Sequence, residues 1–150
     1  DGDFRPASSL LSWDPARPRG TFCRSRTFLL VNAAYCYLDN TIGWDRGELL
    51  PALRSANGDM AITMVLAHEY GHAVQRMGGL VDRTTPTLVL EQQADCFAGS
   101  YVRWVAEGES PRFRLSTRTK SAAPARPCVP LTASTKSPHS RESPSFAVTR

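Results

Sequence analysis

The chain has 150 residues, 41% of them hydrophobic, and this length predicts a single domain with room for a short tail. No apolar run in the chain approaches the roughly 18 residues of a membrane-spanning helix, which excludes such a helix within this sequence. The formal net charge of +4 belongs to the C-terminal region, because residues 116–150 hold six basic residues and one acid, whereas 1–115 hold 12 basic and 13 acidic residues.

The N-terminal third of the chain predicts an arm followed by short strands. Residues 1–20 contain three prolines and two glycines among scattered charges, which predicts an irregular N-terminal arm. Thr27–Val31 is apolar and partly β-branched, and it predicts a strand. Ala34–Trp44 has aromatic and β-branched residues on both sides of Asp39-Asn40, which predicts a β-hairpin with a turn at this pair.

The middle of the chain predicts helices. Residues 48–54 are compatible with one or two helical turns. Asn57-Gly58-Asp59 then combine a helix stop with a helix start, and they predict a long helix from Met60 to about Met77. A second long helix is expected from Pro86 or Thr87 to about Glu107. Its apolar residues cover most of two faces, so we expect it to be buried on several sides.

Residues 116–150 differ in composition from the rest of the chain. They contain five prolines, many serines and threonines, and no apolar periodicity, which predicts a disordered tail. Phe146 is the only aromatic residue among them and no nucleic-acid-binding motif is present, so we expect no nucleic-acid partner. A basic adaptor for nucleic acid or anionic lipid stays open as a further class, and it depends only on the charge of this tail.

The first long helix contains the motif His68-Glu69-Tyr70-Gly71-His72, which reads H-E-x-x-H. Because residues four apart share a helix face, both imidazoles can bind one metal ion. Glu69 lies to the side of this pair, where it can reach a metal-bound water. A catalytic zinc needs three protein ligands and one open position, so a third ligand must come from elsewhere. The alternative is a pair of core histidines bonded to main-chain carbonyls.

The second long helix supplies acidic candidates for this site. Glu91 and Asp95 are four residues apart, and Glu91 follows His72 by 19 residues, enough for the chain to reverse and pack back. Glu91 would then complete a His₂Glu zinc site, and Asp95 could accept the second N–H of a liganding histidine. A solvated acidic face is the alternative. Apolar neighbours on the same stripe favour an inward-facing surface (Leu88, Ala98 and Val102).

The four cysteines form no C-x-x-C motif, so a structural zinc knuckle is not expected. Cys23 and Cys36 are candidates for a disulfide that closes a short loop, which would fit an oxidising compartment. Two reduced thiols are the alternative. Cys96 lies in the second long helix and is predicted to be a small buried hydrophobic residue.

These residues together predict hydrolysis of a peptide bond. Glu69 would take a proton from the attacking water and pass it to the leaving amine. Spacing does not choose a donor for the oxyanion among five candidates (Tyr35, Tyr70, Arg76, Tyr101 and Arg103). The hairpin at 34–44 has two open interpretations: an edge to which an extended peptide adds as a strand, or an ordinary core hairpin.

Three blocks of the sequence carry a family resemblance. NAAYCYLDNTIGWDRGELLP, HEYGHAVQ and LEQQADCFAGSYVRW occur in this order, and residues 20–115 resemble the bacterial neutral zinc metallopeptidases. The resemblance implies an α+β, zincin-like fold and zinc bound by His68, His72 and Glu91. It also implies Glu69 as the catalytic base, a supporting role for Asp95, and export across a bacterial membrane or attachment to it.

The predicted organisation is an arm at 1–20, a zincin-like metallopeptidase domain at 21–115 and a tail at 116–150. We expect an endopeptidase with a peptide or protein substrate, secreted or anchored through a segment absent from this chain. Members of such a family would have further helix after Leu115, so the break at Ser116 suggests a truncated domain, caused by a frameshift or an annotation error. The alternative function is a catalytically impaired, zinc-binding scaffold. Substrate preference and oligomeric state stay open.

Overall fold

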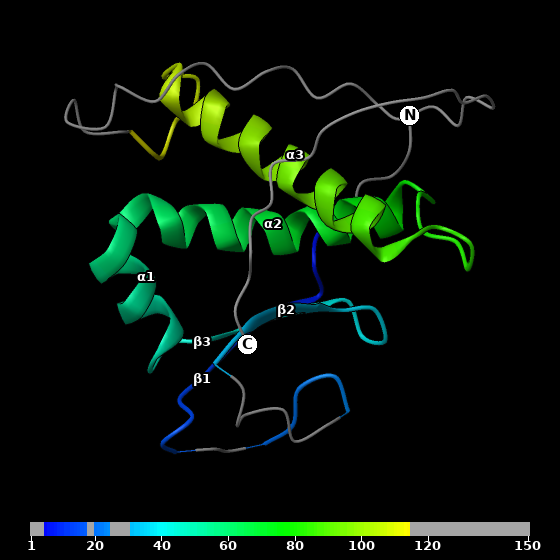
Figure 1. The fold of residues 1–150 in the computed structure, drawn as a ribbon, viewed down its shortest axis with the longest axis horizontal. Coiled ribbons are helices and arrows are strands. Elements are labelled where there is room, and N and C mark those ends of the chain that lie inside the picture. Colours follow the sequence, from blue (N-terminus) through cyan, green and yellow to red (C-terminus); the bar gives the residue numbers. More distant parts are fainter. Residues whose placement is uncertain (1–4, 18–19, 25–30, 115–150) are drawn as a thin grey trace, which may run out of the picture.

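The computed structural model describes residues 5–17, 20–24 and 31–114, which form an α+β fold with three helices and one three-stranded sheet (Figure 1). The strands are β1 (Ser9–Trp13), β2 (Ala33–Cys36) and β3 (Thr41–Asp45). The helices are α1 (Leu49–Asn57), α2 (Asp59–Met77) and α3 (Thr87–Ala106). Most of the strand predicted at Thr27–Val31, and the tail predicted at 116–150, lie outside the described residues.

The sheet has the order β1-β3-β2, so β3 is central and β2 forms one edge. β2 and β3 are antiparallel, with Tyr35 opposite Ile42, and they confirm the predicted hairpin. Asn40 lies in the turn with a positive φ of 56°, a conformation that asparagine tolerates better than most residues. Its side chain accepts a hydrogen bond from the Tyr35 hydroxyl and donates to the Pro6 carbonyl, and these bonds fix the turn.

The prediction of an irregular arm over residues 1–20 is wrong at β1. Ser9–Trp13 pairs with β3 in parallel, with Ser9 opposite Thr41 and Trp13 opposite Asp45. The Ser9 and Thr41 hydroxyls are also hydrogen-bonded at 2.8 Å. The strand depends on a partner 32 residues away, so local composition, dominated by the flanking prolines, does not reveal it.

The predicted disulfide between Cys23 and Cys36 is present and fastens the irregular segment 20–24 to β2. Cys36 is buried with Trp13 and Phe22 in a small apolar cluster on one side of the sheet. On the other side, Tyr35, Ile42 and Ala73 form the cluster that joins the sheet to α2. β2 is thus held from both faces.

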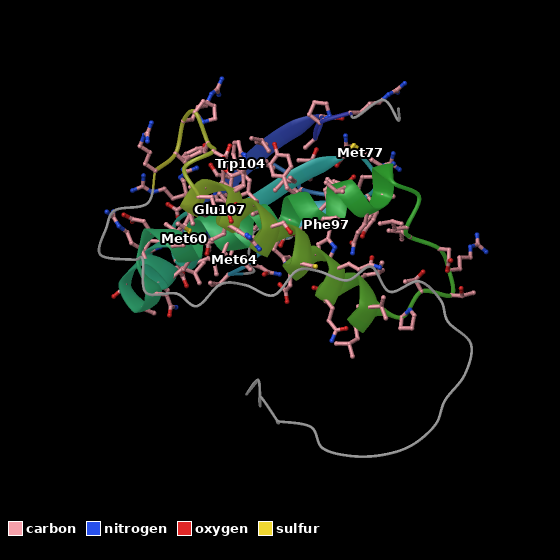
Figure 2. The ribbon with its side chains drawn as sticks, turned by 90° about the horizontal axis from the view of Figure 1, so that it is seen from above. Met60, Met64, Met77, Phe97, Trp104 and Glu107 are labelled. Carbon is pink, nitrogen blue, oxygen red and sulfur yellow. A yellow bond between two sulfur atoms is a disulfide. The ribbon has the colours of Figure 1, made fainter. Side chains whose placement is uncertain are left out.

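The helices begin and end close to the predicted residues. α1 extends slightly beyond the expected 48–54, and the buried carboxylate of Asp45 accepts main-chain N–H bonds from Gly47, Glu48 and Leu49 at its start. α2 lies between the sheet and α3 (Figure 1). Figure 2 shows Met60 and Met64 of α2 at the same end of the molecule as Trp104 and Glu107 of α3, as expected for an antiparallel helix pair.

The expectation that α3 is buried on several sides is wrong. Its buried residues are Ala94, Ala98 and Val105, which form one stripe facing α2, whereas Leu88 is 68% exposed and Trp104 is 40% exposed. Only α2 packs closely on this helix in the part of the chain that is described. Across these same residues, neither α2 nor α3 is long and apolar enough to span a membrane.

Candidate metal centre

Two helices bring three metal-ligand side chains together. His68 and His72 project from the same face of α2, and their Nε2 atoms are 3.1 Å apart. Glu91, in the second turn of α3, has one carboxylate oxygen 3.2 Å from His68 Nε2 and the other 3.6 Å from His72 Nε2. These three residues, which the sequence predicted as ligands, form a group that could hold a metal ion.

Gly71 allows α3 to come close enough for this grouping. A Cβ atom at position 71 would lie 2.8 Å from Ala94 Cα and 2.9 Å from the Ala94 carbonyl oxygen. Both are main-chain atoms, so no side chain could rotate away to make room. Gly71 and Ala94 are therefore the contact at which the two helix backbones meet, and Glu91 lies one turn before it on α3.

His68 is oriented by Asp95. The distance from His68 Nδ1 to Asp95 Oδ1 is 2.8 Å, the contact that the sequence predicted for this carboxylate. However, the side chains of Glu91 and Asp95 are 48% and 66% exposed, so they reach the histidines from the solvent-facing rim. The expectation that the stripe of Leu88, Ala98 and Val102 turns inward holds for Ala98, which is buried, and is wrong for Leu88, which is 68% exposed near Glu91.

His72 is oriented by Gln75, a residue that the sequence interpretation missed. Gln75 is fully buried, and its Oε1 lies 2.9 Å from His72 Nδ1. Its Nε2 donates to the Leu90 carbonyl and to Gln93 Oε1, both on α3. Since Nε2 is the donor, Oε1 must accept the proton of His72 Nδ1. The available signal was a glutamine three residues after His72, on the same face of the helix.

These partners determine the chemistry of the group. A carboxylate oxygen and an amide oxygen accept hydrogen bonds, so each imidazole donates its Nδ1–H. In the neutral ring, which is the form that binds a metal, Nε2 then carries the lone pair, and the two Nε2 atoms face each other and the Glu91 carboxylate. A cation stabilises such a set of acceptors. The bonds from the two Nδ1 atoms to Asp95 and Gln75 are of the kind that metal-binding histidines make with their other ring nitrogen.

Glu69 lies beside the metal-ligand group and is buried, with 7% of its surface exposed. Burial raises the pKa of its carboxyl group and Glu91 adds to this, whereas His72, His68 and a hydrogen bond from the Tyr35 main-chain N–H oppose it. The bond to Tyr35 links the carboxylate to β2. Glu69 is therefore held in a fixed place between the metal-ligand group and the sheet.

A cleft of about 480 Å³ runs between β2 and the two long helices. It is lined by Ala33, Ala34 and Tyr35 of the sheet edge and by the metal-ligand group with Glu69. Asn32 directs its carbonyl toward β3, where it accepts the Asp45 N–H. Because main-chain groups alternate along a strand, Ala33 and Tyr35 direct theirs away from β3. The β2 edge thus presents main-chain hydrogen-bonding groups away from the sheet.

The structure also separates the candidate oxyanion donors. Tyr70 and Tyr101 line a separate, apolar cavity of about 620 Å³, and Arg103 is paired with Glu107 at 2.7 Å. The Tyr35 hydroxyl donates to Asn40 and accepts a bond from Arg76. Tyr37 lines the cleft but was not among the candidates. Burial, together with Tyr35, Glu91 and Glu69, raises the pKa of Tyr37.

Cys96 differs from its prediction as a small buried hydrophobic residue. It is half-buried on α3 and is disulfide-bonded. The described chain has no free cysteine.

Comparison with known proteins gives relatives without an assigned activity. The chain is similar to uncharacterized proteins of mycobacteria, Rv2575 and MT2651 of Mycobacterium tuberculosis and Mb2605 of Mycobacterium bovis. Each is 32% identical over 87 residues, which cover 51% of this chain and 30% of the relative. The match thus spans less than a third of these relatives' length. No family model and no solved structure matches the chain.

Proposed function

We propose that this chain is a zinc-dependent metallopeptidase domain with a zincin-like arrangement of its helices and sheet. The observation that carries the proposal is the convergence of His68, His72 and Glu91 on one point, with the buried carboxylate of Glu69 beside them. Two histidines and a glutamate are a ligand set used by catalytic zinc sites, which leave a fourth position open.

The spacing of the three ligands fits zinc. With metal–ligand bonds of about 2.0–2.1 Å in tetrahedral geometry, neighbouring ligand atoms should be about 3.3 Å apart. The Nε2 atoms of the histidines are 3.1 Å apart, and two different Glu91 oxygens lie 3.2 Å from His68 and 3.6 Å from His72. With one ligand atom from each residue, the three atoms lie within 4.8 Å of one another, so the Glu91 carboxylate would turn one oxygen toward both histidines to bind the ion.

In the proposed reaction, the residues of the chain position water and substrate and move a proton. Zinc, when bound, would polarise the scissile carbonyl and lower the pKa of a coordinated water. Glu69 accepts a proton from the attacking water and delivers it to the leaving amine. The N–H of Tyr35 holds the Glu69 carboxylate toward the cleft, and Asp95 and Gln75 hold the two imidazoles.

The β2 edge favours a peptide or protein as the substrate. Its outward main-chain groups, other than the Tyr35 N–H that bonds Glu69, can pair with an extended peptide, which adds as a strand along the cleft. The opening of the cleft along this edge favours an endopeptidase. The disulfide between Cys23 and Cys36 is expected of a protein outside the cytoplasm, so we place the activity there.

The proposal is tested by metal analysis of the purified protein together with digestion of a mixed peptide library, with and without a chelator. We expect about one zinc per chain and cleavage that the chelator abolishes. Glu69→Gln should keep the zinc and lower kcat at least 100-fold, since a general base contributes about that factor or more. Full activity of Glu69→Gln would contradict the role of Glu69.

A zinc-binding scaffold is the second candidate, and one feature of the site favours it. The metal-ligand group joins α2 to α3, so an ion would also fasten the two helices together. In that case chelation would lower the melting temperature, but the zinc-loaded protein would cleave no peptide. The two measurements together therefore distinguish the candidates.

A further inference from the structure

Arg76 lies beside the cleft, because it contacts the side chain of Tyr35, a residue that lines the cleft. It follows His72 by four residues, so it is on the same face of α2, one turn nearer the C-terminal end. Its guanidinium extends toward the sheet, where Nη1 donates to the Tyr35 hydroxyl at 3.4 Å. Figure 1 shows the turn after β2 at the same end of the molecule as the last turn of α2.

The charge of Arg76 is not matched by an acid among the described residues. Arg54 and Arg103 are ion-paired with Asp59 and Glu107, each at 2.8 Å or less, but Arg76 has only its long bond to a neutral phenol. A guanidinium carries five N–H donors in a planar fork that suits carboxylates. Most of these donors are therefore available to a ligand in this part of the cleft.

Tyr37 adds a second donor at the same place. It lines the cleft, is 39% exposed, and packs its ring against Tyr35 with 4.9 Å between centroids. Its hydroxyl has no hydrogen-bond partner within residues 5–17, 20–24 and 31–114. Tyr35 contacts both side chains, since its hydroxyl accepts the Arg76 bond and its ring packs against Tyr37, so Arg76 and Tyr37 are neighbours that can reach one bound group.

We propose that Arg76 and Tyr37 form a carboxylate-binding subsite, which selects peptides with an acidic residue about two positions from the scissile bond. The distance follows from helix geometry: four residues of α2 place Arg76 about 6 Å beyond His72, at about 1.5 Å per residue. An extended peptide covers this distance in about two residues, at about 3.3 Å each. The inference deepens the proposed peptidase function and rests on it.

The binding test uses zinc-loaded protein with the Glu69→Gln substitution, so that peptides bind without being cleaved. Labelled peptides that differ only in Glu or Gln at one position are compared by fluorescence anisotropy. We expect the Glu peptide to bind at least tenfold more tightly when Glu lies about two residues from the cleaved bond. Adding Arg76→Gln should reduce this preference to less than twofold, and adding Tyr37→Phe should reduce it partly.

Arg103→Gln is the matched control, because it removes an exposed arginine at the other end of the helix pair and should leave the preference unchanged. Each peptide is also prepared with a free and an amidated C-terminus. A preference that follows the acidic side chain supports the subsite as stated. If the preference follows only the free C-terminus, the subsite binds the C-terminal carboxylate of the peptide. That result would overturn the selection of an acidic residue.

Digestion of the mixed peptide library separates this inference from the proposed function. If wild-type protein cleaves peptides in a chelator-sensitive way but without enrichment of Asp or Glu near the cleaved bond, the subsite is wrong and the peptidase stands. If Arg76→Gln keeps the acidic preference, the subsite is likewise wrong. If no peptide is bound or cleaved, both proposals fall.

Discussion

At the scale of single residues, the side chains that orient the ligands matter as much as the ligands themselves. His68 and His72 have different orienting partners: an exposed carboxylate on α3 for His68, and a buried amide on α2 for His72. The carboxylate can be solvated if the contact breaks. The amide cannot, since Gln75 is fully buried and its Nε2 also bonds α3. Gln75 thus couples the orientation of His72 to the position of the helix that carries Glu91.

Gln75→Met should therefore lower metal affinity more than an ordinary surface change. Methionine fills a similar volume but neither accepts the His72 Nδ1 proton nor donates to the Leu90 carbonyl. We expect affinity for zinc to fall about 10- to 100-fold. The free energy of unfolding should fall by about 1–3 kcal/mol, because buried polar groups lose their partners. Competition with a chromophoric chelator and urea unfolding provide the two measurements.

Gln92→Met is the control for this substitution, because Gln92 is exposed on α3. It should change neither the affinity for zinc nor the free energy of unfolding appreciably. If Gln75→Met bound zinc as tightly as Gln92→Met, the orienting role of Gln75 would be refuted.

At the scale of helices and strands, the sequence predicts what local pattern determines. α2 and the hairpin were predictable, because glycine stops, apolar spacing and the Asp39-Asn40 turn act within a few residues. β1 was not, since its partner is distant in sequence. The histidine ligands were predictable from their spacing along the helix. The orienting role of Gln75 was not, because it depends on bonds that Gln75 makes to α3. Apolar periodicity likewise could not show that, among the described elements, α3 packs closely only on α2.

Gly71→Ala tests the close approach of α2 and α3. Alanine favours a helix over glycine by about 1 kcal/mol, but here its Cβ would overlap the main chain at Ala94. We expect the steric cost to exceed the gain in helix propensity, so that the free energy of unfolding falls by about 1–3 kcal/mol. α3 would shift outward and carry Glu91 away from the histidines, so zinc affinity should fall as well.

Gly99→Ala is the matched control on α3, because a Cβ there meets nothing within 4 Å. It should stabilise the protein by about 0.5–1 kcal/mol and leave zinc binding unchanged. Equal effects of the two substitutions in urea unfolding would show that the helix backbones do not meet at Gly71.

At the scale of the whole molecule, two kinds of cross-link connect its layers. The disulfide between Cys23 and Cys36 fastens β2 within the sheet layer. The metal-ligand group joins α2 to α3, which otherwise meet along a narrow stripe of small residues. The cleft lies between these two cross-links, so its shape depends on both. A metal ion should consequently contribute to the stability of the fold and not only to chemistry.

Zinc should therefore raise the melting temperature in proportion to the logarithm of its free concentration. An ion that binds only the folded state adds about 4 kcal/mol at 1,000 times its Kd. For a chain of this length, that corresponds to a rise of roughly 8–16 °C. Glu91→Gln removes the charged third ligand, so the same zinc concentration should raise its melting temperature much less. A melting temperature that zinc leaves unchanged in wild-type protein would contradict a metal bound between α2 and α3. An equal rise in wild type and Glu91→Gln would place the ion elsewhere.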